Sequence, residues 1–263
     1  MLHKVCLIND DGPLSQGLLS LADSLKSRVD LIVVVPDGQR SATGKALTFN
    51  RPIRFTRECA MDGYTLIAHD GMPADSVVIA QYFAKDIALF VSGINSGANV
   101  GYQSILTSGT VCGAIEAAIR GFPAIAVSQE GHSDEWFTPS GSKTDSQYVC
   151  QFTNRLIDLV LQLGMPKGVD VLNLNFPHEI KKTTRLVITK PTSARMVNEV
   201  ERRMDPQGSP YYWIRGIEIE PRPGTDAHEV LVNGNVSLSP FTVEGVSDAL
   251  IDLLRDFVRP LSF

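Results

Sequence analysis

Two adjacent carboxylates stand directly after the first short apolar run of the chain. The run covers residues 5–8 and leads through Asn9 into Asp10, Asp11 and Gly12. If the run is a buried strand, this turn lies at the edge where open α/β sheets bind ligands. Neighbouring carboxylates removed from water repel each other, so one must take up a proton or both must face a cation. The pattern indicates a divalent-metal site that faces a phosphate, and the alternative is an Asp-Gly turn with solvated carboxylates.

Two other polar segments are expected to meet this turn. A loop with Ser41 follows the β-branched run 31–35, and a segment rich in glycine and asparagine, residues 92–101, follows the apolar run 88–91. Carboxyl ends of parallel strands lie at one edge of a sheet, so the three segments should converge. Their hard oxygen donors suit Mg²⁺ or Mn²⁺ rather than zinc, and they come from four side chains: Asp10, Asp11, Ser41 and Asn95. A bare carboxylate repels a phosphate, so phosphate binding should require the metal.

A phosphate seat is predicted at the start of the helix expected over 110–120. Ser108 suits the N-cap, and Val111 stands three residues later, so no capping-box glutamate competes for the free N–H groups. Those N–H groups and the helix dipole favour an anion beside Ser108, Gly109 and Thr110. An ordinary capped helix is the alternative. In the same way, the glycines of 92–101 indicate either an anion nest or a structural loop.

The elements that position these residues follow from the apolar pattern. Short apolar runs alternate with segments of helical period up to about residue 190, which predicts an α/β fold with a parallel sheet. One helix is expected where Leu18, Leu21, Ala22 and Leu25 share a face. Further strands are expected at 64–68, 88–91, 124–127 and 169–174, and further helices at 75–83, 110–120 and 145–163. Beyond Pro191 the sequence predicts a strand at 211–214, two more strand-like pieces and a last helix with an apolar face within 246–257.

Composition narrows the class of protein. The chain has 263 residues, 43% of them hydrophobic and 20% charged, with a formal net charge of −5, so long nucleic acid is a poor partner. No apolar run approaches the roughly 20 residues of a membrane span, and the first apolar run is too short for a signal peptide. The four cysteines show no paired spacing, which indicates free thiols and a cytoplasmic protein.

Other chemistry is disfavoured by missing motifs. The five histidines form no H-E-x-x-H motif, and no G-x-G-x-x-G follows the first run, which argues against a zinc hydrolase and a common dinucleotide fold. The segment His69–Pro73 is predicted to be a turn that enters a helix. Arg40, Lys45, Arg51 and Arg54 form a basic stretch that indicates either a solvated face or attraction for a substrate phosphate.

Taken together, the motifs resemble the SurE (survival protein E) family. The resemblance covers most of the chain and rests on the order and spacing of segments 8–12, 36–41, 92–101, 108–111, 121–123, 205–213 and 224–226. Members of this family are metal-dependent phosphatases known as 5′-nucleotidases. Met72 and Cys112 depart from the family pattern, and neither is among the proposed ligands.

The resemblance implies a role for each candidate residue. One divalent ion, Mg²⁺ or Mn²⁺, would bind Asp10, Asp11, Ser41 and Asn95. The substrate phosphate would be held by Asn9, Asn99, Ser108, Gly109 and Thr110. The resemblance also implies a Rossmann-like core, here assigned to residues 1–192, and an oligomerisation arm of 193–263 that is exchanged between subunits of a homodimer or homotetramer. Family activity covers nucleoside 5′- and 3′-monophosphates and, in some members, short polyphosphate.

We therefore expect a phosphomonoesterase that hydrolyses nucleoside monophosphates by attack of a metal-activated water. Asp10 or Asp11 would also handle a proton, which makes both of them catalytic candidates. A phospho-aspartyl intermediate is the rival mechanism. Two other classes remain as alternatives: a nucleotide-binding regulator without catalysis, and a metal-dependent nucleotide-sugar transferase, against which the adjacent Asp-Asp pair speaks because it lacks D-x-D spacing.

Overall fold

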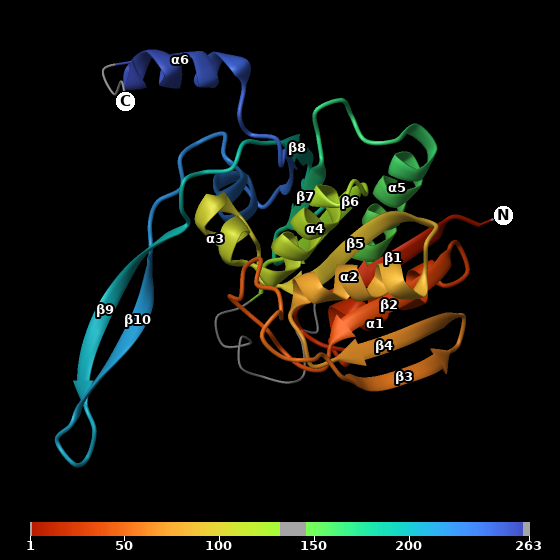
Figure 1. Cartoon of the computed structure of the whole chain (residues 1–263). Helices are drawn as coiled ribbons and strands as arrows, with labels where there is room; N and C mark the ends of the chain where they lie inside the picture. The colour runs from red at the N-terminus through yellow and green to blue at the C-terminus, as the bar shows by residue number, and fades with distance from the viewer. Residues whose placement is uncertain (1, 132–145, 260–263) are drawn as a thin grey trace.

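The computed structural model describes residues 2–131 and 146–259 (Figure 1). It is an α/β fold with a mostly parallel sheet flanked by helices, as the sequence predicts. The strands are β1 (Lys4–Ile8), β2 (Asp30–Pro36), β3 (Phe55–Met61), β4 (Tyr64–His69), β5 (Ile87–Ser96), β6 (Ala124–Gln129), β7 (Val171–Phe176), β8 (Leu186–Ile188), β9 (Met196–Met204), β10 (Pro210–Glu218) and β11 (Val236–Phe241). The helices are α1 (Gln16–Leu25), α2 (Pro73–Phe83), α3 (Gly101–Thr107), α4 (Gly109–Ile119), α5 (Ser146–Leu163), the short π-helix η1 (His228–Val232) and α6 (Asp248–Val258).

Nine strands form one sheet in the order β3-β4-β2-β1-β5-β6-β7-β11-β8. The neighbours from β4 to β7 are parallel, whereas β3 runs antiparallel to β4 and β11 runs antiparallel to β7. The central strand β2 reads Leu31–Val35 at its core and is buried along this whole run, because helices cover the sheet on both faces.

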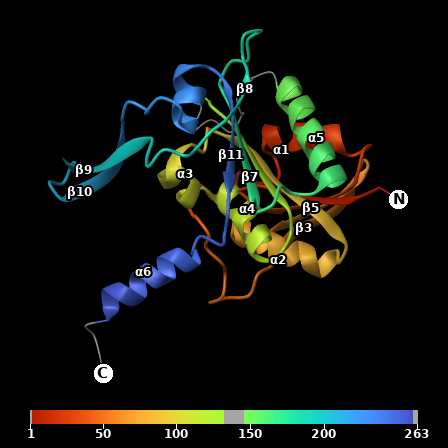
Figure 2. The ribbon, with the colours of Figure 1, turned by 90° about the horizontal axis from the view of Figure 1, so that it is seen from above.

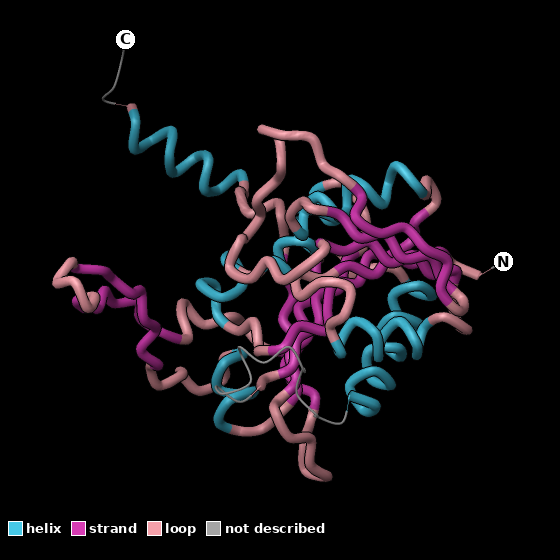
Figure 3. The backbone as a smooth tube through the Cα atoms, turned by 90° about the horizontal axis from the view of Figure 1, so that it is seen from below, coloured by secondary structure: helices cyan, strands magenta, loops and turns pink. Residues whose placement is uncertain are grey.

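The two helical layers pack on opposite faces of the sheet (Figures 2 and 3). On one face α1 and α5 pack over the side chains of Val5 and Leu7, and on the other α2 and α4 pack over Cys6 and Ile8. The apolar face predicted for the first helix is confirmed, since all four of its residues are buried in α1. Together the layers make the Rossmann-like core.

The order of the strands reverses at β1. After β1 the chain crosses through α1 to β2 on one side, and after β4 it crosses through α2, on the other face, to β5 on the far side of β1. A reversal of this kind leaves a crevice outside the carboxyl ends of the two strands, here β1 and β5.

Some elements differ from the sequence-based prediction. The strand predicted at 88–91 continues to Ser96 as β5, so half of the glycine-rich segment belongs to the sheet. β3 was not predicted because it is an exposed edge strand with polar residues on both faces, and α3 was not predicted because it is only seven residues long. Asp145, the expected first residue of the long helix, lies outside the described residues.

Two elements project from the body of the molecule. Figure 1 shows β9 and β10 as a long hairpin and α6 as a separate helix, and Figure 2 shows both pointing away from the sheet. Every residue of β10 is exposed, and α6 has no buried residue. β11 also comes from the segment 193–263, yet it lies in the main sheet between β7 and β8. Within the described residues, no helix is long and apolar enough to cross a bilayer.

Candidate active site

The turn after β1 is closed by Asn9. Its Nδ2 donates to the carbonyl of Gly12 at 2.9 Å, and its Oδ1 accepts from the Gly12 N–H at 3.2 Å. Gly12 has φ +89°, and a Cβ there would lie 3.0 Å from the Cα of Gly38 in the next loop, so this turn requires glycine. Asn9 is fully buried and therefore shapes the turn that presents the two carboxylates. Its expected contact with phosphate stays a prediction.

Asp10 faces the N-terminus of α4. Its Oδ1 accepts a hydrogen bond from the Thr110 hydroxyl. A Cβ on Gly109 would lie 2.7 Å from the Asp10 Cβ, so only glycine lets the helix come this close. Burial raises the pKa of Asp10, while the Thr110 hydroxyl and the backbone N–H groups of Thr110 and Gly109 oppose that rise. The donors that we expected to seat a phosphate thus face a carboxylate.

Asp11 lies beside Asp10 and faces β5. Burial, and then the negative charge of Asp10, raise the pKa of Asp11 to about 7, against the effect of the Ser96 N–H. Among the described residues, no lysine or arginine forms an ion pair with either carboxylate. Two neighbouring buried carboxylates without a cationic partner make a site that favours a bound cation.

Ser41 comes to this turn on the loop after β2. The Arg40 N–H donates to the carbonyl of Asp10 at 2.7 Å, which joins the loop directly to the turn. The Ser41 side chain is exposed, and its Oγ accepts from Gln39 Nε2 at 3.0 Å. The predicted convergence of this loop with Asp10 is therefore found in the backbone.

Asn95 stands near the end of β5, next to the Ser96 N–H that faces Asp11. Its Nδ2 donates to the carbonyl of Gly97 at 2.6 Å. That bond turns the amide nitrogen away and leaves Oδ1, which accepts no hydrogen bond from the described residues. Two carboxylates, a hydroxyl and an amide oxygen form a donor set that fits a hard divalent cation. A search for three clustered His, Cys, Asp or Glu residues finds none in the described part of the chain, and this donor set needs only two.

Asn99 is held by polar side chains from the middle of the sheet. Its N–H donates to Asn175 Oδ1 at 2.7 Å, its Nδ2 donates to Ser128 Oγ at 2.8 Å, and its carbonyl accepts from Asn173 Nδ2 at 3.0 Å. Sequence reasoning missed these supporting residues. A usable signal was present, because Asn173 and Asn175 alternate with leucines in an otherwise apolar strand, which points both amides to one face.

Two acidic residues fasten the segment around Asn99. Glu130 accepts from the Ala98 N–H at 3.0 Å and binds Arg195 through both guanidinium nitrogens at 2.7 and 2.9 Å. Asp226 accepts from the Gly101 N–H at 2.7 Å. Glu130 was not singled out from the sequence, whereas Asp226 lies in one of the segments that carry the resemblance.

The remaining predictions near the site concern local structure. Ser108 caps α4 by accepting from the Val111 N–H at 3.1 Å, which confirms the predicted N-cap. The segment 69–73 is the predicted turn into a helix, and it leads into α2. Burial lowers the pKa of His69 to about 4, so its ring is neutral between Ser76 Oγ and the Gly71 N–H.

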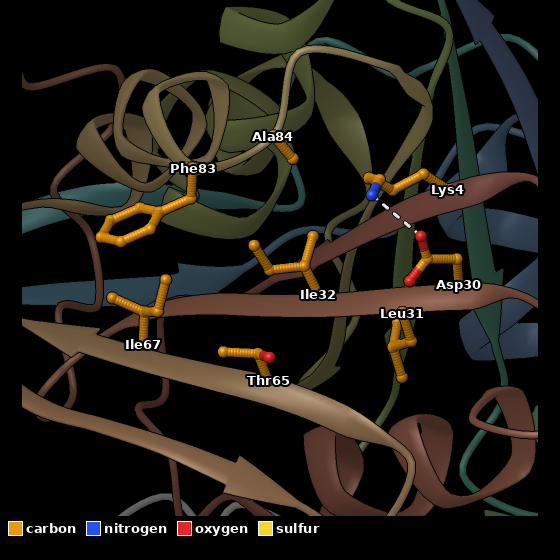
Figure 4. Close-up of a pocket in the computed structure, with 8 residues that line it drawn as sticks. All are labelled: Lys4, Asp30, Leu31, Ile32, Thr65, Ile67, Phe83 and Ala84. Atoms are coloured by element: carbon orange, nitrogen blue, oxygen red, sulfur yellow. Dashed lines mark ion pairs between the residues drawn. The ribbon is translucent and has the colours of Figure 1, made fainter.

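A cavity of about 220 Å³ lies at the opposite edge of the sheet (Figure 4). Lys4 and Asp30, at the amino ends of β1 and β2, point toward each other across its rim and form an ion pair of 2.8 Å. The wall beside them carries the apolar Ile32 and Phe83. This cavity holds none of the predicted site residues.

The fold and the donor set define an α/β protein whose hard oxygen donors gather where a parallel sheet reverses its order. The chain belongs to the SurE family, because the family model described as survival protein SurE matches residues 5–198.

Individual relatives are similar over nearly the whole chain. The 5′-nucleotidase SurE of Thermofilum pendens is 37% identical over 257 residues, covering 97% of this chain and 96% of the relative. The 5′-nucleotidase SurE of Thermococcus gammatolerans is 39% identical over 246 residues, covering 92% and 90%. The crystal structure of a SurE protein from Aquifex aeolicus superposes with a TM-score of 0.77 at 31% identity and covers 97% of this chain and 99% of that one.

Proposed function

We propose that the protein is a divalent-metal-dependent 5′-nucleotidase, a phosphomonoesterase that hydrolyses nucleoside monophosphates. Membership of the SurE family and relatives named 5′-nucleotidase over nearly the full length support the activity. The observation that carries the proposal is the position of Asp10 and Asp11, two buried carboxylates without an ionic partner at the strand reversal.

In this proposal one Mg²⁺ or Mn²⁺ is held by the four hard donors: Asp10, Asp11, Ser41 and Asn95. When bound, the ion supplies positive charge for the phosphate and acidity for the attacking water. Asp11 is the better candidate to hold a proton, because its raised pKa lies near neutrality.

The N-terminus of α4 binds the phosphate in this proposal. The N–H groups of Gly109 and Thr110 point toward the turn after β1, where they suit the phosphoryl oxygens. Because Asp10 faces the same donors, a carboxylate and a phosphate compete for them unless a cation draws Asp10 to itself. Asn99, fixed on three sides, offers its remaining amide group to the same substrate.

The assay that tests the proposal measures phosphate release from nucleoside 5′- and 3′-monophosphates and short polyphosphate, with Mg²⁺, Mn²⁺ or EDTA. We expect release from 5′-monophosphates with a divalent ion and none with EDTA. Hydrolysis that is indifferent to EDTA would contradict the metal site. AMP binding with Mn²⁺ but without phosphate release would support the regulator instead, and a radiolabelled acyl-phosphate trapped by acid quench would replace direct water attack with the phospho-aspartyl route.

We also propose that residues 1–192 form the catalytic part, and that 193–263 form an arm that joins subunits of a homodimer or homotetramer by exchange. Exposed apolar side chains on the β9–β10 hairpin and on α6 support an interface there. The cytoplasmic location expected from the sequence stays a prediction.

A further inference from the structure

The loop that carries Ser41 lies on the surface of the molecule. We call residues 37–54, between β2 and β3, the Ser41 loop. Ser41 is exposed, and the one hydrogen bond of its hydroxyl among the described residues comes from Gln39 in the same loop. The position of this proposed metal ligand therefore depends on how the rest of the loop is fastened to the body.

Three backbone hydrogen bonds tie the loop down. The Arg40 N–H donates to the carbonyl of Asp10 at 2.7 Å, and the Gly44 N–H donates to the carbonyl of Thr107, just before α4, at 2.8 Å. The Thr48 N–H donates to the Asp75 carboxylate on α2 at 3.0 Å. These bonds leave the side chain of Lys45 to face α4.

Lys45 forms an ion pair with a carboxylate that is buried under the loop. Its Nζ lies 2.5 Å from Oε2 of Glu116, whose side chain is 3% exposed, while Arg120 Nε lies 2.6 Å from the other oxygen. Among the described residues, Lys45 is the one ionic partner of Oε2. A buried carboxylate needs partners for both oxygens, so Glu116 holds Lys45, and with it the loop, against α4.

The same helix places the rest of the site. The first turn of α4 faces Asp10 through Gly109 and Thr110, and Glu116 lies further along the helix. A tie between Lys45 and Glu116 therefore fixes the Ser41 loop relative to the helix that fixes Asp10. A basic residue that the sequence left as a solvated charge or a phosphate attractor is instead bound to a carboxylate inside the protein.

We propose that Lys45 is a positioning residue for the metal site, and that its ion pair with buried Glu116 keeps Ser41 within reach of the cation held by Asp10 and Asp11. The inference rests on the proposed function, because it takes Ser41 as a ligand. It concerns binding of the ion before any substrate is present.

Mn²⁺ binding to the purified full chain, followed by electron paramagnetic resonance without substrate, tests the proposal. Lys45→Met keeps the aliphatic stem and removes the charge, and we expect Mn²⁺ to bind about fivefold more weakly. Removing a positive charge near a cation site would by itself strengthen binding, so weaker binding has the opposite sign from a simple charge effect. Lys45→Arg should restore most of the affinity.

The matched control is Arg51→Met in the same loop. Arg51 pairs with Asp70 at 3.0 Å and makes no ion pair with α4, so its loss should leave Mn²⁺ binding within twofold of the wild type. Equal weakening in both variants would show that any lost ion pair loosens the loop, and it would overturn the specific role of Lys45.

A double variant separates positioning from stability. Lys45→Met leaves a buried carboxylate oxygen bare and should lower the melting temperature. Lys45→Met with Glu116→Gln removes that charge and should recover part of the melting temperature while Mn²⁺ binding stays weak. Recovery of both together would assign Lys45 a structural role only.

The two proposals fail in different ways. If the wild type binds no Mn²⁺, or if Asp10→Asn binds it equally well, the metal site itself is wrong. If the wild type binds Mn²⁺, Asp10→Asn does not, and Lys45→Met equals the wild type, the metal site stands and the positioning role of Lys45 is overturned.

Discussion

Asp10 holds its carboxylate against the N-terminus of α4, where burial and helix donors act on its pKa in opposite directions. Asp11, one residue later, has no helix terminus beside it, and the pKa of its carboxyl rises to about 7. Adjacent residues of the same type therefore meet different surroundings because a strand end turns their side chains apart.

Asp10→Asn tests the site at the level of a single atom. The amide keeps the shape of the side chain but halves the negative charge offered to the cation. Loss of an outer partner of a metal ligand costs roughly 10–100-fold, so loss of a ligand should cost at least about 100-fold in kcat/KM. The melting temperature of the metal-free protein should not fall, because a neutral amide relieves the repulsion with Asp11. Retained turnover with unchanged metal dependence would rule out this site.

The raised pKa of Asp11 makes metal binding depend on pH. A carboxyl whose pKa is raised on folding contributes most stability at low pH, and it loses that contribution as pH rises toward 7. A cation must displace the proton, so Mn²⁺ affinity should rise about tenfold per unit below pH 7 and level off above it. Titrations at several pH values measure this slope. Asp11→Asn should bind weakly with no such slope, and an unchanged slope would assign the proton to another group.

Candidate residues with unusual chemistry were visible in the sequence, whereas their supports were not. Asp10 and Asp11 stand out because adjacent carboxylates after an apolar run are costly without a partner. Asn173 supports Asn99 from 74 positions away in the chain, and no local pattern states which loop a strand amide will meet. The partner of Lys45 was equally hidden, because pairing with Glu116 depends on how a loop lies across a helix.

At the scale of elements, the contact between β1 and α4 sets the site. Both Gly109 and Gly113 face side chains of β1 or its turn: a Cβ on Gly113 would lie 2.9 Å from Ile8 Cδ1. The helix therefore rests on the strand along two of its turns. Sequence reasoning expected this small-residue face, because glycine and alanine repeat along α4, but the residue that each glycine meets follows from the sheet order.

Gly109→Ala should push the start of α4 away from the turn after β1. The added Cβ would stand 2.7 Å from the Asp10 Cβ, well inside contact distance, so we expect a loss of about 1–3 kcal/mol of stability and more than tenfold in activity. Urea unfolding and the nucleotidase assay measure the two effects. Gly245→Ala is the control, because a Cβ there meets no atom within 4 Å. Equal effects in both variants would show that α4 does not need glycine for this approach.

Strands with long apolar runs and helices with one apolar face were predictable, because burial imposes those periods directly. β3 escaped because an edge strand with both faces exposed has no such period. The extension of β5 to Ser96 escaped because glycine and asparagine are poor strand formers, and here tertiary pairing of Asn95 with Ser128 overrides that preference.

At the scale of the whole molecule, the projecting elements carry apolar faces that the single chain leaves in water. On the hairpin Val200 and Ile214 are cross-strand partners, 69% and 76% exposed. The charged Glu201 and Arg215 lie on the other face and bind each other at 2.8 Å. A ribbon with one apolar and one charged face is typical of a strand pair that packs against a partner.

We expect sedimentation at micromolar concentration to give a mass at least twice that of the monomer. Ile214→Asp should shift the protein toward the monomer, because it places a charge in the middle of the apolar face. Leu163→Asp, an equally exposed leucine at the end of α5, serves as the control and should leave the mass unchanged. A monomeric wild type would refute the proposed assembly.

The ends of the hairpin meet at its root. The N–H of Ile219 donates to the carbonyl of Arg195 at 3.1 Å, so the chain leaves the body and returns to it at neighbouring points. A tight turn of a few residues could bridge that spacing without stretching the backbone. Genetic excision of residues 197–217 would consequently yield a shortened chain in which β11 still reaches its place beside β7.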